Sequence, residues 1–413
     1  MTLGTEQHDF ASLLSWLDDQ QDNMVETVQH WSKVNSGTTN LDGLATMADL
    51  LVDALAPLDG TITRHDLKPS IDVASDGTKQ EVPFGQLIHF SKRPEAPKKI
   101  LLTGHYDTVF PKDSHFQTPK FIDDNTLNGP GVADMKGGIL VMLNALMALE
   151  KSNLAGNIGY EIIFNPDEET GSHGSGDMLA ERAKHADFGM TFEPALADGT
   201  LAGARKGSGN FAFVCRGLAA HAGREFHKGR NAIWYVSRLV ADLYDLNGIQ
   251  EGITINPGVI EGGSALNVVP DLAICRFNVR AATFDEMRWM EAELDKLVAK
   301  YNQEDGFSVE LTGNFNRPPK ELSGKNLKLF EMLKACGHDL GLEVQWKATG
   351  GCCDGNNLAA AGLPNIDTLG VRGGLIHSDQ EFVLVDSFAE RAKLSALLML
   401  KYAAGEFDFN DDD

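Results

Sequence analysis

Histidines and carboxylates recur at the ends of short apolar segments, where they could bind metal ions or move protons. His105 and Asp107 follow the apolar segment KKILLTG, and residues i and i+2 of a strand point to the same side. The Asp107 carboxylate could therefore hold the far ring nitrogen of a metal-bound His105, the usual arrangement behind a histidine ligand. Taken alone, the pair also fits a strand-end histidine beside an exposed aspartate.

Three further segments carry carboxylates at similar positions. Asp134 lies in the glycine-rich stretch GVADMKGG, where it could bind a metal or cap the helix that follows. Glu168 and Glu169 follow the apolar run 158–165 in PDEETG, and like charges packed there repel one another unless a cation or a shared proton offsets them. Glu193 follows another apolar run. Ligand sites of α/β sheets lie at such carboxyl ends of strands.

A second histidine, His377, stands far down the chain in the glycine-led segment GGLIHSD. Two histidines and at least three carboxylates would suit a pair of zinc-like ions bridged by one carboxylate. Two divalent cations would slightly exceed the charge of Asp134, Glu169 and Glu193, and one bound hydroxide would bring the site close to neutral. The five cysteines show no CxxC spacing, so sulfur ligands are not expected.

The elements that must position these residues alternate between strands and helices, which indicates an α/β domain with a largely parallel sheet. Hydrophobic spacing predicts helices over residues 8–34, 42–56, 135–149, 326–340 and 384–403, and strands at 85–90, 99–103, 158–165, 189–192, 343–346 and 365–369. Residues 207–316 instead follow the order βαββαβ, typical of a ferredoxin-like α+β unit. We therefore expect one catalytic domain, residues 1–206 and 317–413, interrupted by an inserted domain, residues 207–316.

Five segments in the same order, HYD, GVADMKGG, PDEETGS, FEP and GLIHSD, resemble the di-zinc metallopeptidase superfamily of glutamate carboxypeptidases, aminoacylases and deacylases. The resemblance is closest to the glutamate carboxypeptidase branch and covers about residues 95–385. It implies two divalent metal ions, with zinc as the first expectation and cobalt or manganese left open. One ion would be held by His105, Asp134 and Glu193, and the other by Asp134, Glu169 and His377.

The same resemblance assigns roles beside the metals. Glu168 matches the general acid/base of the family, and Asp107 matches the carboxylate that orients His105. The resemblance also implies a cis peptide bond between Asp134 and Met135.

The inserted segment contributes three further matches. AHAG resembles the family segment SHAG, whose histidine, here His221, reaches the neighbouring subunit's site as an oxyanion donor; Ala220 replaces its serine. Asn267 in ALNVVP matches a polar substrate contact, and Arg280 in FNVR matches the arginine that clamps a substrate carboxylate. Without the resemblance, Arg280 would be interpreted as an edge-strand arginine facing water. A homodimer formed through the inserted domain is therefore expected.

One segment departs from the family pattern. The family's GGGTDA reads GGCCDG here, with Gly351 as a candidate substrate contact and Cys353 at the threonine position, which affects the substrate pocket more than the metals. Several histidines outside these motifs are expected to be solvated or capping residues: His65, His89, His115, His173, His185, His227 and His338.

These parts predict hydrolysis of an amide or peptide bond, with Glu168 taking a proton from a metal-activated water and returning it to the leaving nitrogen. The first expectation is release of a C-terminal amino acid, of glutamate type, from a short peptide or N-acyl amino acid. An N-acyl-amino-acid deacylase is the alternative within enzymes. A catalytically silent binding protein on the same scaffold is disfavoured because the base and all expected ligands are present.

Composition narrows the partners. The 413 residues include 36 Lys+Arg against 59 Asp+Glu, for a formal charge of −23, which disfavours nucleic acid and anionic membranes as partners. No apolar run reaches the ~18 residues that a membrane span needs, and the acidic N-terminus lacks a signal-peptide pattern. Scattered cysteines suit a reducing compartment. We expect a cytoplasmic protein that acts on a small molecule.

Overall fold

A six-stranded sheet carries most of the residues singled out above. The computed structural model describes residues 10–322 and 324–407. In this sheet β8, β5, β9 and β19 run parallel, β4 is antiparallel to β8, and β1 is antiparallel to β4. The order across the sheet is β1 (Thr61–Asp66), β4 (Gln86–Lys92), β8 (Ile158–Asn165), β5 (Lys98–His105), β9 (Phe188–Thr191) and β19 (Asn365–Ile366).

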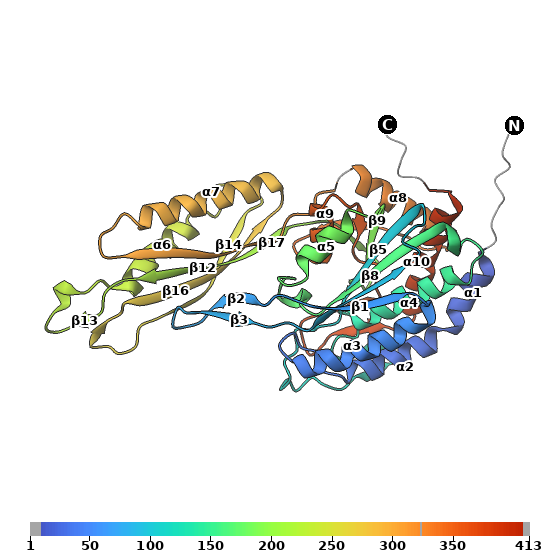
Figure 1. Cartoon of the computed structure of the whole chain (residues 1–413), viewed down its shortest axis with the longest axis horizontal. Coiled ribbons are helices and arrows are strands. Elements are labelled where there is room, and N and C mark those ends of the chain that lie inside the picture. The colour runs from blue at the N-terminus through green and yellow to red at the C-terminus, as the bar shows by residue number, and fades with distance from the viewer. Residues whose placement is uncertain (1–9, 323, 408–413) are drawn as a thin grey trace.

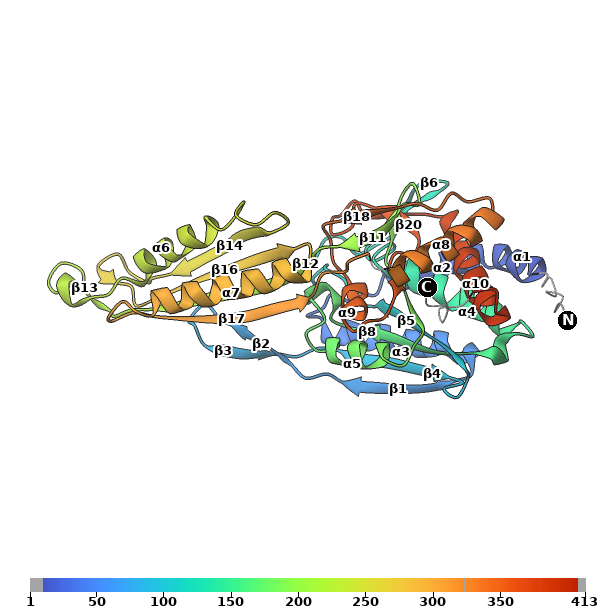
Figure 2. The ribbon, with the colours of Figure 1, turned by 90° about the horizontal axis from the view of Figure 1, so that it is seen from above.

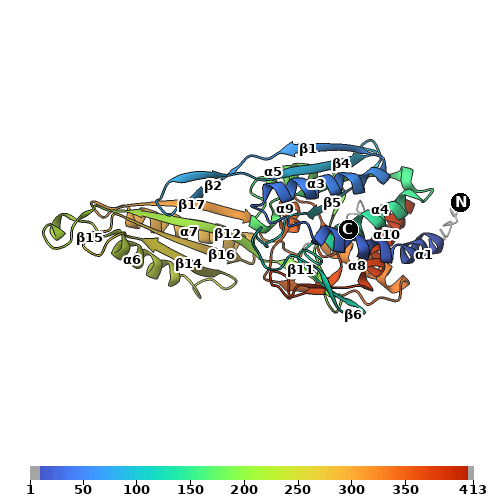
Figure 3. The same ribbon diagram turned by 90° about the horizontal axis from the view of Figure 1, so that it is seen from below.

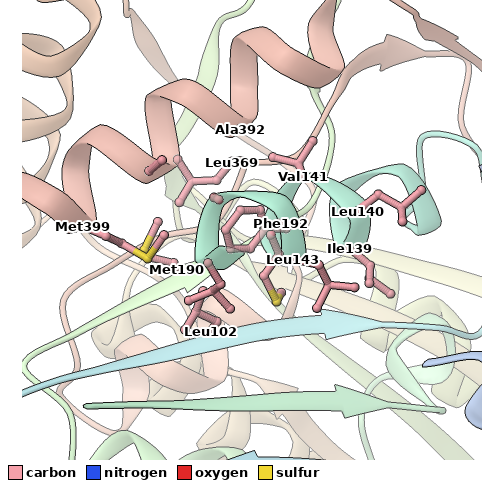
Figure 4. Packing of buried hydrophobic residues seen from close by; sticks show 14 of the residues in the cluster. Leu102, Ile139, Leu140, Val141, Leu143, Met190, Phe192, Leu369, Ala392 and Met399 are labelled. Atoms are coloured by element: carbon pink, nitrogen blue, oxygen red, sulfur yellow. The ribbon is translucent and has the colours of Figure 1, made fainter. Parts of the chain in front are cut away.

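Helices cover both faces of this sheet, because its strands are apolar on both sides. Leu102 packs against one group of helices, and its neighbour Leu101 belongs to a separate apolar cluster on the other face. Figure 4 shows Leu102 and Met190 lying beneath Leu143 of one such helix. The first group comprises α1 (Ala11–Asp19), α2 (Gln21–Ser32), α3 (Leu41–Leu55), α4 (Lys136–Glu150), α8 (Gly324–Asp339) and α10 (Ser387–Ala404); the second comprises α5 (Gly176–Ala183) and α9 (Asp354–Ala360).

Smaller sheets complete this part of the molecule. A five-stranded sheet brings the segment before α4 beside the segment after residue 370, in the order β10 (Ala195–Leu196), β20 (Arg372–Gly374), β21 (Phe382–Leu384), β7 (Thr126–Asn128) and β6 (Lys120–Asp123). A two-stranded sheet pairs β11 (Leu201–Arg205) with β18 (Trp346–Thr349).

The inserted segment forms a separate four-stranded antiparallel sheet with its own core, and it extends away from the first part (Figures 1 and 2). Two helices, α6 (Ala232–Tyr244) and α7 (Phe284–Tyr301), pack on one face of this sheet. Its strands lie in the order β14 (Thr254–Gly262), β16 (Leu272–Ala281), β12 (Gly207–Arg216) and β17 (Ser308–Arg317). The order along the chain is the expected ferredoxin-like βαββαβ. The short strands β13 (Ala220–His221) and β15 (Val268–Val269) pair at its far tip.

The chain enters and leaves this sheet at one place. Arg205 and Lys320 pair through their backbones, with N···O distances of 2.9 and 3.0 Å. Their side chains share the buried carboxylate of Asp367, at 2.8 Å from each. The domain limits expected at 206/207 and 316/317 lie close to this pairing of Arg205 with Lys320, and we keep them as a proposal.

A hairpin that the sequence reasoning did not predict links the two parts. It consists of β2 (Ser70–Val73) and β3 (Lys79–Val82) and reaches from the first part along the inserted sheet (Figure 3). Arg276 donates to the carbonyl of Val73 at 2.8 Å, Arg216 donates to Gly77 at 3.0 Å, and the ammonium of Lys79 lies 2.7 Å from Glu310.

Several expected elements differ from the structure. The strand expected at 365–369 is only the two-residue strand β19, Asn365–Ile366. The helix expected over residues 8–34 is two helices, α1 and α2, which meet at Gln20; residues 8 and 9 lie outside the described part. The strand expected at 343–346 is instead β18, which begins at Trp346. No helix in residues 10–322 and 324–407 has the length and apolar character that crossing a bilayer requires.

Candidate active site

Neighbouring parallel strands end beside one another and deliver three of the candidate ligands to one edge of the sheet. His105 is the last residue of β5, Glu169 lies in a short 3₁₀ turn after β8, and Glu193 stands two residues beyond β9. Asp134 comes from the turn before α4, where the peptide bond to Met135 is cis, as the resemblance implied. His377 follows β20.

These side chains form two groups that share one member. In the first group, Nε2 of His105 lies 3.0 Å from Oδ1 of Asp134 and 3.7 Å from Oε1 of Glu193. In the second, Nε2 of His377 lies 3.2 Å from Oδ2 of Asp134 and 3.2 Å from Oε2 of Glu169. Within each group the ligand atoms all lie within 4.8 Å of one another. Asp134 therefore presents one oxygen to each group.

The carboxylates of this cluster are largely buried and repel one another, while His377 is exposed at its edge. Burial and the charge of Asp134 raise the pKa of Glu169 to about 7, and burial also raises the pKa of Glu193. Hydrogen bonds to Asp134 and Glu169 raise the pKa of His377 to about 11. Positive charge must therefore enter the cluster, as protons or as metal ions.

One atom, Oε1 of Glu193, favours metal ions over protons as the source of this positive charge. Oε1 of Glu193 is buried and accepts no hydrogen bond from any residue in the described ranges. A buried carboxylate oxygen without a donor is costly, whereas a carboxylate and an imidazole facing the same space are oxygen and nitrogen ligands that Zn²⁺ accepts. The residues present therefore fit a divalent metal at each group.

Asp107 holds several parts of the site together. Nδ1 of His105 lies 3.3 Å from Oδ1 of Asp107 and 3.1 Å from its backbone carbonyl. The carboxylate of Asp107 also accepts from Thr38 Oγ1 at 2.7 Å and from the backbone N–H groups of Glu168 and Glu169 at 3.2 Å each. The same carboxylate thus fixes the His105 ring and the turn that carries both glutamates.

Glu168 lies beside the two groups without belonging to either. Burial raises the pKa of its carboxyl well above the usual range, and the charge of Arg317 opposes that shift. The buried Arg317 guanidinium donates to Oε1 of Glu168 at 2.7 Å and to Oδ1 of Asp354 at 2.9 Å. Sequence reasoning missed Arg317; its only signal was its place before Pro318 and Pro319, where the inserted segment ends.

Glu381 is a second residue that sequence reasoning missed. Its buried carboxylate accepts hydrogen bonds from the backbone N–H groups of Gly131 at 3.2 Å, Ala133 at 2.9 Å and Asp134 at 3.1 Å. Burial raises its pKa to about 8. Since Glu381 follows His377 by four positions, one segment supplies a candidate ligand and fixes the turn that carries Asp134. That spacing was the available signal.

A cleft of about 720 Å³ opens beside Glu168 and Glu169 and extends to the inserted sheet. Arg280 lines it from β16, with Nε 2.9 Å from Oδ1 of Asn278 and Nη1 3.3 Å from Sγ of Cys352. Gly351 lines the same cleft, and its carbonyl accepts from Arg205 at 3.2 Å.

The two adjacent cysteines, Cys352 and Cys353, have different structural roles. Cys352 lines the cleft beside Arg280. Cys353 is buried and caps α9: its Sγ accepts from the backbone N–H of Gly355 at 3.3 Å, and its own N–H donates to Asn356 at 3.0 Å. At the family's threonine position, Cys353 therefore acts as a helix cap.

The structure does not bring His221 and Asn267 to the rest of the site within one chain. Both lie at the far tip of the inserted part, where β13 pairs with β15 (Figure 1). His221 is exposed, and its Nδ1 accepts from the backbone of Gly223 at 3.1 Å and of Arg224 at 3.2 Å.

Two of the histidines that fit no motif, His65 and His89, are not solvated as expected. His89 is half-buried on β4, and its Nε2 lies 2.8 Å from Oε2 of Glu161 on the neighbouring strand β8. His65 is half-buried beside it, with ring centroids 6.0 Å apart. Their side chains pack on the sheet surface and are neither fully solvated nor helix caps.

Comparisons with known proteins agree with this geometry. Residues 101–401 match the family model described as peptidase family M20/M25/M40. Carboxypeptidase G2 of Pseudomonas sp. (strain RS-16) is 29% identical over 399 residues, which cover 94% of this chain and 91% of that protein. Succinyl-diaminopimelate desuccinylase of Rickettsia akari is 24% identical over 329 residues, 73% of this chain and 82% of that protein.

Solved structures share the fold. Aminopeptidase PepT of Bacillus cereus superposes with a TM-score of 0.70 at 23% identity, covering 92% of this chain and 97% of that one. The metallo-carboxypeptidase Sso-CP2 of Sulfolobus solfataricus gives a TM-score of 0.69 at 16% identity, with coverage of 92% and 99%. With the family match spanning most of the chain and two groups of metal-ligand residues in place, this protein is a metal-dependent hydrolase that belongs to peptidase family M20/M25/M40.

Proposed function

We propose that the chain is a two-metal hydrolase that releases a C-terminal amino acid, of glutamate type, from a short peptide or N-acyl amino acid. The observation that supports this most strongly is the pair of ligand groups sharing Asp134, with Glu168 beside both and part of neither. His105 and Glu193 would complete one ion's ligands, and Glu169 and His377 the other's. Zinc is the ion we propose, since the donors are imidazole and carboxylate.

When bound, such ions activate a water molecule and polarise the substrate carbonyl. Glu168 would take the proton of that water through its carboxylate and pass it to the leaving nitrogen. Burial raises the pKa of Glu168 above its usual acidic range, which is the direction that favours proton transfer by a carboxylate near neutral pH. Asp107 keeps the His105 ring oriented through the cycle.

Arg280 would bind the free carboxylate of the substrate. It lines the same cleft as Glu168 and Glu169, and a guanidinium can donate two parallel hydrogen bonds to a carboxylate. Gly351, which lines the same cleft, would contact the substrate through its backbone.

We further propose a homodimer in which His221 and Asn267 act at the partner's site. Their place at the far tip, away from their own chain's ligands, favours action in trans. His221 would stabilise the oxyanion of the tetrahedral intermediate. The large negative charge supports a small-molecule substrate over a nucleic acid or membrane partner.

A hydrolysis screen tests this function. N-acyl amino acids and dipeptides would be offered to the protein after chelation and again after addition of zinc, with Glu168→Gln as the matched inactive control. We expect zinc-dependent release of the C-terminal amino acid and a loss of at least ~10²-fold in kcat for Glu168→Gln, with both metals retained. Release of acetate or succinate from simple N-acyl amino acids, without cleavage of peptides, would favour the deacylase alternative. No zinc-dependent cleavage of either class would contradict the proposal.

A further inference from the structure

Four asparagines form a row across the inserted sheet, one from each of its strands. Asn256 on β14 is directly opposite Asn278 on β16, which is opposite Asn210 on β12, which is in turn opposite Asn314 on β17. Side chains directly opposite each other in antiparallel strands project to the same face. The residues next to the row, Phe211, Ile255, Phe277 and Phe315, belong to the core beneath α6 and α7. The asparagines therefore face away from the helices.

That face forms one wall of a groove. A cavity of about 500 Å³ lies between this face of the sheet and β2 of the hairpin, residues 70–73, and all four asparagines line it. The groove adjoins the cleft of the active site, because the two cavities share the lining residues Ser70, Asp72, His173, Asn210 and Asn278. A substrate bound in the cleft therefore has a continuous path along the row.

The row offers uncharged hydrogen-bonding groups. Nδ2 of Asn278 donates to Oδ1 of Asn210 at 2.8 Å, and its Oδ1 accepts from Arg280 Nε at 2.9 Å, so the middle of the row is joined to the arginine of the cleft. Among the described residues, none makes a hydrogen bond to the side chains of Asn256 or Asn314, which are exposed. Each of these amides keeps two donors and an acceptor available.

The groove also contains the charged side chains of Arg276 and Asp72, but within the part of the chain that the structure describes they make no hydrogen bond to the amides of Asn256 and Asn314. Arg276 lies in the same cavity, but its guanidinium is engaged by Glu261 at 3.0 Å and by the carbonyl of Val73 at 2.8 Å. Asp72 contributes a carboxylate on the hairpin side. Adjacent strands lie about 4.8 Å apart, so the row extends over roughly 14 Å across the sheet, from Asn256 to Asn314.

We propose that this groove is a substrate subsite. It would bind a unit that is attached through an amide bond to the side chain of the released amino acid, and would thereby favour substrates that carry such an extension. The inference rests on the proposed function, because Arg280 fixes the leaving residue's carboxylate where the cleft meets the row. From there, the leaving residue's side chain enters the groove and exchanges hydrogen bonds with Asn256 or with Asn314, which lie at opposite edges of the sheet, in place of water.

Binding measured separately from turnover tests the subsite. The probes are N-benzoylglutamine and the same compound with glycinamide attached through its side-chain amide. Titration calorimetry would be run on the zinc-loaded Glu168→Gln protein, which does not consume the probes, with and without Asn256→Ala and Asn314→Ala. The matched control is Glu291→Ala, an exposed change on α7 across the sheet. We expect the extended probe to bind roughly tenfold more tightly, about the net value of one or two hydrogen bonds.

The two asparagine changes together should abolish that difference and leave the short probe's affinity unchanged, while Glu291→Ala should change neither. Equal affinity for the two probes, or an advantage that survives both asparagine changes, would overturn the subsite. Tighter binding of a probe extended on its benzoyl side, lost in the same variants, would overturn its assignment to the leaving group. Hydrolysis of the probes by the unmodified enzyme is measured in a separate assay. If the enzyme fails to hydrolyse them, the proposed function is contradicted, but the binding data still test the subsite.

Discussion

Arg317 donates a hydrogen bond to the carboxylate of Glu168 over 2.7 Å, and both side chains are buried. Arg317 is the last residue of β17, so the inserted sheet supplies the cation that faces the candidate general base. The same guanidinium binds Asp354 at the start of α9. The position of the inserted sheet is thereby coupled to the charge on Glu168.

Replacing Arg317 with methionine should slow the enzyme and shift its pH dependence. Without the guanidinium, burial and the charges of Glu193 and Asp354 act on Glu168 with less opposition, and its pKa rises further. The form that accepts a proton then appears only at higher pH. We expect kcat at neutral pH to fall at least ~10-fold and the acidic limb of the kcat/KM profile to move to higher pH. Arg317→Lys should recover part of the rate. An unmoved acidic limb would contradict this role, and Arg288→Met on the exposed face of α7 is the control.

Arg280 separates a carboxylate-selective enzyme from a general amidase. Hydrogen bonds to charged groups contribute about 1.5–3 kcal/mol each, and two on one carboxylate are not fully additive. Arg280→Ala should therefore cost roughly 2–4 kcal/mol, which lowers kcat/KM roughly 30- to 1000-fold for substrates with a free C-terminal carboxylate. The loss should shrink for the matching amides, and Arg280→Lys should restore little, since lysine cannot form the two-pronged contact. Steady-state kinetics on acid and amide pairs measures this. Equal losses for both would place Arg280 in the fold and not in recognition.

His221 should act on the partner subunit. His221→Ala is expected to form normal dimers with low turnover, because the change removes an exposed ring at the tip and no core contact. Mixing it with Glu168→Gln protein should restore part of the activity, since each mixed dimer then contains one complete site. Activity after verified subunit exchange is the measurement. If exchange occurs without any gain in rate, His221 does not act in trans.

Metal binding should release protons, and more of them in acid. The pKa of Glu169 is about 7 and that of His377 about 11, and both groups must lose their protons to bind a cation. His377 should release a proton at about pH 6 and at about pH 8, whereas Glu169 should add a second one mainly at about pH 6. Affinity should therefore weaken as pH falls from about 8, because His377 is protonated, and more steeply below about 7, where Glu169 is protonated as well. Calorimetry in buffers of different ionisation heat counts the protons, and Glu169→Gln should remove the difference between the two pH values.

Sequence reasoning was most accurate where one local signal decided the structure. The strand Ile158–Asn165 and the helix Phe284–Tyr301 have the bounds expected, because each is a continuous hydrophobic pattern between clear breaks. The ligand residues meet because parallel strands end at one edge, a consequence of topology that strand–helix alternation already indicates.

Features that depend on distant partners could not be found in this way. The hairpin β2–β3 has mostly exposed residues and no apolar alternation, and it is held by contacts such as Arg276 with Val73, more than 200 positions apart. Arg317 and Glu381 were not predicted as site residues, because only the folded chain places Glu168 and the backbone of Ala133 against them. His89 is similar, since Glu161 on the next strand is what keeps its ring from water.

The backbone pairing of Arg205 with Lys320 has a consequence for how such a chain can change over time. The entropy lost in closing a loop grows with its length, but a segment that folds with its own ends together imposes little of that loss on its host. The more than one hundred residues between these two positions return to the point from which they left. Insertions and deletions inside that segment can therefore accumulate while the sheet holding His105 and Glu193 keeps its stability. New specificities can arise there, provided that Arg317 still reaches Glu168.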